Sequence, residues 1–345
     1  GYTSYTDAAV GPAMNVREAG AAGERAIYCY KKLQDEGKLT ARVSLGLYSG
    51  ISGLQSYEYL KHDLTKFDFP EFDNPDWLEM KMIKVFCDGV HIFHTAWVKD
   101  EYTDLPGSHG RSCLCGAEAS EEEQIKELHA MIELAHQSGY QLGVHAIGDF
   151  AVKITIDGFV NAMQKYPREN PRHYVIHADV MGDNEDLLKA AKFGIGVSAQ
   201  PNLADHMYEK SITCIGKKGK RIFGLKEMLD LGVKVAGGSD TYSGEFPHWR
   251  KGVQSAVTRR SGITGKIHSP ELALNVEEAV RLFTINGAYQ EGKENVRGSI
   301  EVNKVADFQV LDKDIFEVDH EEIGDIQVVM TMVDGKIVYQ KEGAI

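Results

Sequence analysis

Short apolar runs rich in β-branched residues alternate along the chain with longer segments whose apolar residues recur at helical spacing. Such alternation is typical of βα units built around parallel strands. Seven strands are predicted, at residues 1–7, 41–47, 82–88, 141–145, 173–177, 194–200 and 233–238. This is one strand short of a (β/α)8 barrel. An open doubly wound sheet would also fit the number, but such sheets normally carry a glycine-rich phosphate turn after the first strand, and the sequence shows none.

Local signals mark several helices between these strands. Ser120 followed by Glu123 is a capping box, and it leads into apolar residues at helical spacing. Gly232 closes another helix, and residues 276–282 begin the last one. The long segment at residues 100–119 is rich in Gly, Ser and Asp and has no clear period. After a barrel strand, such a loop is a candidate lid over an active site.

The pattern changes after about residue 295. Apolar alternation at residues 306–311, 328–333 and 336–339 predicts a small antiparallel β unit, and Asp334-Gly335 is a strong two-residue hairpin signal. We therefore expect two domains: a barrel at residues 1–295 and part of a small β-sandwich at residues 296–345. An unpaired edge of this small unit makes a homo-oligomer an expected state of the chain.

The beginning of the chain is a strand-like run without an initiator Met. A natural protein rarely opens inside a strand. We therefore interpret the chain as a fragment or a processed product, and expect the eighth barrel strand to lie upstream of Gly1.

Composition narrows the possible partners. The 345 residues carry a formal net charge of −13, which argues against nucleic acid because phosphate binding needs clustered Lys and Arg. No apolar run approaches the ~18 to 20 residues that span a bilayer, so we expect no membrane partner either. Five cysteines, an odd number, fit a reducing cytoplasm better than export, and we expect a cytoplasmic protein.

Four polar residues stand at or near the ends of predicted strands, where (β/α)8 barrels carry their active sites. They are Lys84, His145, His177 and Asp240. Each alone is a weak signal, because a strand-end His is commonly a hydrogen-bonded structural residue and a Lys in a strand commonly extends its ammonium to solvent. Together they indicate a metal site, since neutral imidazoles suit Zn²⁺ and a carboxylate completes the set.

The segments around these residues resemble the amidohydrolase superfamily, and most closely its family 3. That family includes N-substituted formamide deformylases and AepA-like proteins. The resemblance extends from Gly1 to about Tyr339. The matching motifs are Ile83-Lys84-Val85, Lys84-x-Phe86-x-Asp88-Gly89, Thr95-Ala96, Val144-His145-Ala146-Ile147-Gly148-Asp149, Arg172-His173-x-x-x-His177-Ala178, Gln200-Pro201, Gly238-Ser239-Asp240, Ala256-Val257-Thr258-Arg259, Gly298-Ser299-Ile300 and Ala306-Asp307-Phe308.

The resemblance implies a TIM-like barrel of the metal-dependent hydrolase type, with one or two divalent ions, zinc above all. Lys84 would be carboxylated by carbon dioxide and so become a metal ligand. His145 and His177 would bind the second ion. Asp240 would bind the first ion and move the proton between a metal-activated hydroxide and the leaving group.

Two departures from the family pattern qualify this expectation. The family's His-x-His at the end of the first strand is absent, so the first metal site should be impaired while the second keeps its ligands. Ile176 stands where family members often have Glu, so the surroundings of His177 should differ.

Other polar and aromatic residues lie on loops at the expected catalytic face. The predicted substrate contacts are Asp88, His91, Trp97, Gln200, His206 and Tyr242. His94, Asp179 and Trp249 belong to the same group of loop residues, whereas His173 is predicted to be structural. Asp88 could equally cap a turn.

The resulting hypothesis is hydrolysis of a non-peptide amide-type C–N bond in a small molecule. A deaminase, cyclic amidase or esterase on the same scaffold remains open, because one fold hosts many reactions. A catalytically inactive truncated or regulatory AepA-like domain remains open as well.

Overall fold

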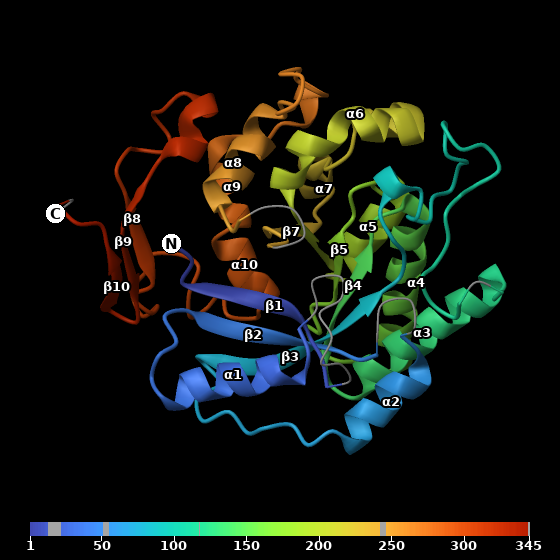
Figure 1. Ribbon diagram of the computed structural model, residues 1–345, viewed down its shortest axis with the longest axis horizontal. Coiled ribbons are helices and arrows are strands. Elements are labelled where there is room, and N and C mark those ends of the chain that lie inside the picture. Colours follow the sequence, from blue (N-terminus) through green and yellow to red (C-terminus); the bar gives the residue numbers. More distant parts are fainter. Residues whose placement is uncertain (13–21, 51–54, 117, 242–245, 344–345) are drawn as a thin grey trace.

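Seven parallel strands form one curled sheet, whose order in space is the order in the chain (Figure 1). The computed structural model describes residues 1–12, 22–50, 55–116, 118–241 and 246–343. The strands are β1 (Ser4–Val10), β2 (Arg42–Tyr48), β3 (Leu78–Phe86), β4 (Gln141–Ala146), β5 (Tyr174–His177), β6 (Gly196–Ala199) and β7 (Lys234–Gly237). All seven predicted strands are thus confirmed, with ends displaced by up to four residues.

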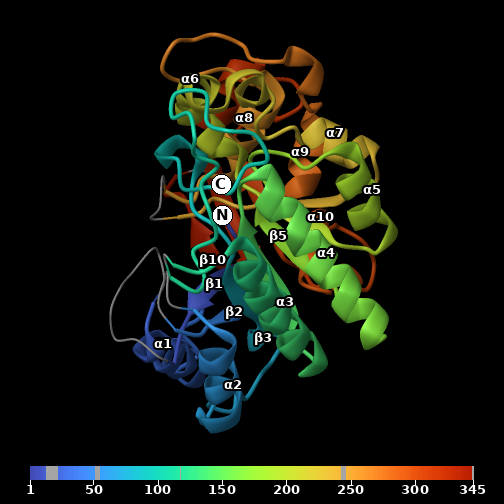
Figure 2. The ribbon, with the colours of Figure 1, turned by 90° about the vertical axis from the view of Figure 1, so that its right-hand side faces the viewer.

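Helices surround this sheet. They are α1 (Glu24–Asp35), α2 (Tyr57–Lys66), α3 (Glu121–Gln137), α4 (Asp149–Lys165), α5 (Asn184–Lys192), α6 (Ala204–Ile215), α7 (Leu225–Asp230), α8 (Trp249–Thr258), α9 (Val276–Leu282) and α10 (Ile285–Gln290). In both Figure 1 and Figure 2, α1 and α2 flank the sheet at β1–β3. Helix α3 contacts β4, and α4 contacts both β4 and β5. The predicted capping box begins α3, where the Ser120 hydroxyl accepts from the Glu123 N–H. No helix in the described residues is long and apolar enough to cross a membrane.

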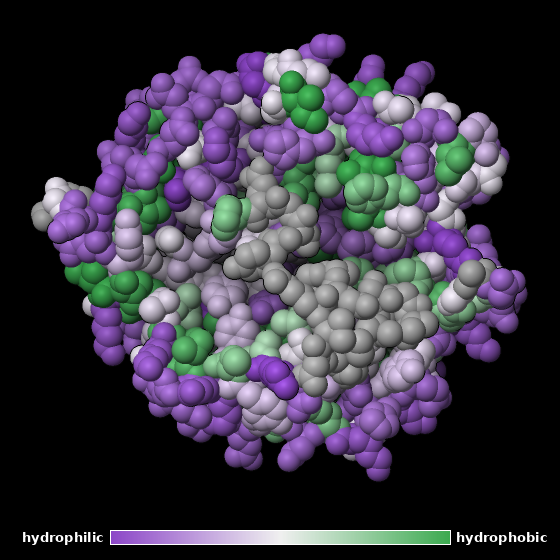
Figure 3. Space-filling model, viewed as in Figure 1, coloured by the Kyte–Doolittle hydropathy of each residue, from purple (hydrophilic) through white to green (hydrophobic). Residues whose placement is uncertain are grey.

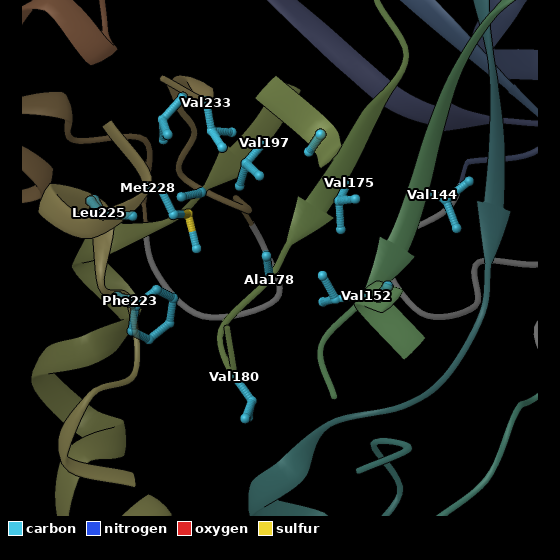
Figure 4. Close-up of a cluster of buried hydrophobic side chains, with 14 of the residues drawn as sticks. Val144, Val152, Val175, Ala178, Val180, Val197, Phe223, Leu225, Met228 and Val233 are labelled. Carbon is cyan, nitrogen blue, oxygen red and sulfur yellow. The ribbon is translucent and has the colours of Figure 1, made fainter. Parts of the chain in front are cut away.

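The alternation of strand residues separates a packed outer layer from the positions that face the inside of the curl, where apolar side chains such as Met82 and Ile176 accompany the polar ones. In β3 and β4, Ile83, Val85 and Val144 point outward into the core between sheet and helices. Figure 4 shows this core where Val144 and Val175 approach helix residues such as Val152. Burying each such side chain stabilises the fold by about 1.5–3 kcal/mol. The alternate positions of the same strands therefore face the inside of the curl.

The sheet is a half-barrel. Among the described strands, β1 pairs with β2 alone and β7 with β6 alone, so the two edge strands do not pair with each other. The TIM-like fold class is confirmed in this curled, seven-stranded form. An open doubly wound sheet is excluded, because its strand order would reverse within the sheet instead of following the chain.

A three-stranded antiparallel sheet follows the barrel strands. It comprises β8 (Phe308–Leu311), β9 (Val328–Val333) and β10 (Lys336–Gln340), in the order β10-β9-β8. The predicted hairpin joins β9 to β10, and Asp334 (φ 52°) and Gly335 (φ 73°) both adopt the left-handed conformation that a type I′ turn requires. The division into two domains at residue 295 and the homo-oligomer stay predictions.

A buried ion pair ties the small sheet to the barrel. The Arg42 Nε of β2 donates to the Asp307 carboxylate at 2.9 Å, and both side chains are almost fully buried. The same carboxylate accepts from the Asp334 backbone N–H at 2.7 Å. The Ala306-Asp307-Phe308 motif therefore fixes the hairpin against the barrel.

Candidate active site at the carboxyl ends of the strands

A cavity of about 1860 Å³ opens at the carboxyl ends of β3–β7 and continues toward the gap between β1 and β7. Figure 3 shows the molecule hollowed near the middle of this face. Six of the predicted site residues line the cavity: Lys84, His145, His177, Gln200, His206 and Asp240. Tyr242 lies outside the described residues. The structure therefore places the predicted ligands in one cavity.

Lys84 points into the half-barrel because it alternates with Ile83 and Val85, which fill the outer core. Its side chain is buried, and Nζ lies 4.4 Å from the centre of the Phe86 ring. Burial lowers the pKa of Lys84 to about 7, although the nearby Asp240 carboxylate opposes this shift. In the described part of the chain, no hydrogen-bond acceptor binds Nζ. Much of this amine is therefore neutral near pH 7, unlike an ordinary surface lysine.

His145 enters the cavity from the inward face of β4. Its Nε2 lies 3.2 Å from the Gly89 carbonyl oxygen, so this nitrogen carries the hydrogen and donates. Its Nδ1, which then bears a lone pair, has no hydrogen-bond partner among the described residues. Burial, together with His177 and Lys84, lowers the pKa of His145 well below its ordinary value. The imidazole is therefore neutral, as a metal ligand must be.

His177 reaches the cavity through a change in backbone conformation. By strand alternation it would point outward like Val175, but φ is 81° at His177 and 53° at Ala178. Such left-handed residues cost of order 1–3 kcal/mol each and gather at functional sites. The turn brings the ring centres of His177 and His145 to 4.5 Å. A regular strand would have separated the two rings.

Gln200 fixes the tautomer of His177. The Gln200 Nε2 donates to the Ser198 carbonyl oxygen at 3.0 Å, which turns its Oε1 toward His177 Nδ1 at 2.7 Å. His177 Nδ1 therefore donates, and Nε2 keeps its lone pair. Burial lowers the pKa of His177 to about 4, against an opposing effect of Asp240. Gln200 thus orients a ring nitrogen for a ligand.

Asp240 follows β7 with φ at 50°, again in the left-handed region. Its charge acts on both Lys84 and His177, so it belongs to the same cluster. In the described part of the chain, the ligand atoms of His145, His177 and Asp240 do not all lie within 4.8 Å of one another. The ligand atoms of another group, His94, Asp104 and Cys214, do lie that close together. The site is therefore assembled but not drawn together to coordination spacing.

These residues fit a divalent metal by their chemistry. His145 and His177 are neutral, hydrogen-bonded at one nitrogen and without a partner at the other in the described part of the chain, which is the state of a zinc-binding imidazole. Lys84 is a buried amine with a depressed pKa, and Asp240 supplies a carboxylate. An ion could thus be held by His145 and His177, joined by Lys84 and Asp240.

Three of the predicted substrate contacts do not line the cavity. Asp88 is buried and accepts three backbone N–H groups, from Trp97 at 2.8 Å and from Ile147 and Gly148 at 2.9 Å. Trp97 packs beneath this arrangement against Phe150. The turn-organising alternative for Asp88 is the one that the geometry supports, because both of its oxygens are engaged.

His91 and Asp179 form a second buried pair beside the cavity. His91 Nε2 lies 2.6 Å from the Ser211 hydroxyl, and His91 Nδ1 lies 3.8 Å from Asp179 Oδ2. Neither Asp179 oxygen has a hydrogen-bond partner among the described residues, and burial raises the pKa of Asp179 well above its ordinary value. Asp179 lines the cavity, whereas His91 does not. The only sequence signal for Asp179 was its place two residues after His177.

The segment at residues 100–119 is not a lid in its described part. None of those residues lines the cavity. Instead, the Thr103 N–H donates to the Cys214 carbonyl oxygen of α6 at 2.8 Å. Lys218, just after α6, pairs with Asp100 at 2.7 Å. The loop is therefore packed against the α6 region.

The fold and the site together define a TIM-like barrel protein with a polar, metal-compatible cluster at the carboxyl ends of its strands. The chain belongs to the Amidohydrolase family, whose model matches residues 13–339.

Similar proteins agree with this assignment. The chain is 34% identical over 269 residues to YtcJ of Bacillus subtilis (strain 168), an amidohydrolase by name. The aligned region covers 77% of this chain and 48% of YtcJ. The chain is 30% identical to the N-substituted formamide deformylase of Arthrobacter pascens, over 63% of this chain and 40% of the deformylase. The chain thus spans about half the length, or less, of these curated relatives.

A solved structure shares the fold. An uncharacterized metal-dependent hydrolase from Pyrococcus furiosus matches with a TM-score of 0.65 and 23% identity, over 86% of this chain and 53% of that chain. At this identity the likeness supports the barrel fold alone, because one fold hosts many functions.

Proposed function

We propose that this chain belongs to a metal-dependent hydrolase that cleaves a non-peptide amide-type C–N bond in a small molecule. The observation that carries the proposal is the pair His145 and His177. Both are neutral, each has one nitrogen that the described residues leave free, and their ring centres lie 4.5 Å apart in the cavity. Family membership and the relative named as a deformylase favour a C–N bond as the target.

The ion would be held by His145 and His177, and zinc is the ion that such neutral imidazoles favour. A bound divalent metal supplies an acidified water and polarises a carbonyl group. Lys84 is suited to become a further ligand, because a neutral amine adds carbon dioxide to give a carbamate and a proton. Its pKa of about 7 makes the required neutral form abundant at physiological pH.

Asp240 is the residue proposed to move the proton. It lines the cavity within electrostatic reach of Lys84 and His177. As a carboxylate it accepts the proton of the attacking water and returns it to the nitrogen as the C–N bond breaks. The departing amine thus leaves neutral.

The test is a substrate screen on zinc-loaded protein, with N-formyl and N-acyl amines compared with cyclic amides, esters and deaminase substrates. We expect turnover of an acyclic amide and a 10²- to 10⁴-fold fall in kcat for Asp240→Asn, the usual contribution of a positioned acid–base group. Asp230→Asn, at an exposed position on α7, is the matched control.

An Asp240→Asn variant that stays within a few-fold of the parent would overturn the assigned mechanism. Preference for a cyclic amide, an ester or a deaminase substrate would replace the substrate class. No turnover of any of these compounds by zinc-loaded protein would overturn the proposal that this chain is catalytic by itself.

A further inference from the structure

A second group of metal-ligand side chains lies away from the cavity. His94, Asp104 and Cys214 each offer one ligand atom, and these atoms all lie within 4.8 Å of one another. His94 follows η1 (His91–Phe93), Asp104 lies in the long loop after it, and Cys214 is on α6. None of the three lines the cavity or belongs to the proposed catalytic set.

The distances within this group are close to those of a zinc site. His94 Nε2 lies 2.8 Å from Asp104 Oδ1, and Cys214 Sγ lies 3.7 Å from Asp104 Oδ2. Zinc bonds of the usual lengths in a tetrahedron separate such ligand atoms by about 3.3–3.5 Å. The sulfur–oxygen pair would contract slightly and the nitrogen–oxygen pair would part by about 0.5 Å. Both are side-chain adjustments.

The surrounding structure holds the three ligands in place. His94 is in the left-handed conformation at φ 58°, and its ring packs edge-on against buried Tyr102 at 4.9 Å. Thr103, the neighbour of Asp104, donates its backbone N–H to the carbonyl oxygen of Cys214 at 2.8 Å. The loop and α6 are thus already joined at the site, so an ion would bind without a large rearrangement.

Access and charge also suit a cation. The His94 and Asp104 side chains are about one quarter exposed, which leaves a route from solvent. Burial and the Asp104 charge raise the pKa of Cys214, so its thiol is protonated without a metal. The competing cation is Lys210, whose Nζ lies 3.8 Å from Asp104 Oδ2 on a half-exposed side chain that can turn to solvent.

We propose that His94, Asp104 and Cys214 form a second metal site, selective for a thiophilic divalent ion such as Zn²⁺. The ion replaces the hydrogen that His94 Nε2 donates to Asp104, and the neutral ring then carries its hydrogen on Nδ1. It binds the freed Nε2 lone pair, one Asp104 oxygen and the Cys214 sulfur, whose proton leaves to solvent. A water completes the tetrahedron. The ion joins η1 to α6, and both elements carry cavity-lining residues, Phe93 on η1 and His206 on α6.

Cobalt titration of metal-free protein tests this site separately from the catalytic one. Thiolate bound to Co²⁺ gives a charge-transfer band in the near ultraviolet, and the proposed catalytic ligands include no sulfur. We expect the band in the parent protein, its loss in Cys214→Ser, and an affinity at least tenfold weaker in His94→Gln. Added Zn²⁺ should abolish the band.

Two controls keep the outcome decisive. The band should persist in His145→Ala, which removes a proposed catalytic ligand. It should also persist in Cys113→Ser, because this variant removes the thiol whose charge acts on Lys84 and leaves Cys214 in place. Zn²⁺ should also raise the melting temperature of His145→Ala but not that of His145→Ala/Cys214→Ser. A folded parent protein without the band, or a band lost in Cys113→Ser but kept in Cys214→Ser, would overturn the proposal. Neither result would bear on hydrolysis.

Discussion

Two buried histidine pairs stand at opposite ends of the same barrel strands. His145 and His177 lie at the carboxyl ends of β4 and β5, with ring centres 4.5 Å apart. His136, near the end of α3, and His173, just before β5, lie at the amino ends, with ring centres 5.0 Å apart. Both pairs are edge-to-face, and burial lowers the pKa of all four imidazoles.

The difference between the pairs is in their hydrogen bonds. At the amino end, His136 Nε2 donates to the Tyr166 carbonyl oxygen and His173 Nε2 donates to His136 Nδ1, both at 2.8 Å. His173 Nδ1 accepts the Leu142 N–H at 3.0 Å. All four ring nitrogens are used. At the carboxyl end, His145 Nδ1 and His177 Nε2 have no hydrogen-bond partner among the described residues.

This contrast separates structural from functional histidines in physical terms. A fully hydrogen-bonded buried pair contributes to stability and has no lone pair left for a ligand. A pair with two free lone pairs gains less from folding and can bind a cation. The position agrees, since barrels place catalysis at the carboxyl ends and stability at the amino ends of their strands.

Removal of one imidazole from each pair should give reciprocal results, and this is the largest effect that we expect. His145→Ala should lose one equivalent of bound metal and change the unfolding free energy of metal-free protein by about 1 kcal/mol. His173→Ala should keep the metal but cost about 3–5 kcal/mol, because it leaves a cavity and unpairs the Leu142 N–H and a His136 nitrogen. Metal analysis after dialysis and urea unfolding in chelator measure the two quantities.

The same two measurements can break the contrast between the pairs. If His173→Ala lost the metal while folded, or if His145→Ala were as destabilising as His173→Ala, the division into functional and structural pairs would be wrong. If the parent chain bound almost no metal, the family assignment would stand, but the proposal that this chain binds a metal by itself would be wrong.

Gln200 should be the next most sensitive position, because it holds the tautomer that frees His177 Nε2. Gln200→Leu should weaken metal binding by about 10- to 100-fold, as loss of a ligand-orienting hydrogen bond typically does. Gln200→Glu keeps an oxygen acceptor and should stay within a few-fold of the parent. Competition with a chromophoric chelator measures both affinities. Equal losses in the two variants would show that Gln200 acts through packing.

Much of this arrangement could be predicted from the sequence, because strand periodicity is local. The alternation around Lys84 and His145 is enough to put both side chains on the inner face of their strands. The capping box at Ser120 and the hairpin at Asp334-Gly335 depend on neighbouring residues alone, and both are confirmed.

Other features depend on contacts between distant segments and could not be predicted. Alternation would turn His177 outward, and only the left-handed backbone at His177 and Ala178 brings it to His145. The three backbone N–H groups that occupy Asp88 come from two later loops. The joining of Asp104 to α6 likewise depends on a contact across more than a hundred residues.

The smallest effect that we expect concerns the pH dependence of stability, to which the amino-end pair should contribute. The pKa of His136 and of His173 is lowered in the folded chain, by burial first and then, for His173, by His136 and Arg168. Below about pH 6.5 the two histidines bind protons in the unfolded chain but stay neutral in the folded chain. Their contribution to the free energy of unfolding is therefore fully present above that pH and is lost as the pH falls. The slope should approach about 1.4 kcal/mol per pH unit for each such histidine.

Urea unfolding between pH 7.5 and 5 (about one unit either side of the ordinary His pKa) should therefore show a flatter profile for His173→Phe than for the parent. An unchanged slope in His173→Phe would contradict this prediction. It would mean that the amino-end pair takes up protons in the folded chain as well, against the hydrogen bonds of two neutral rings.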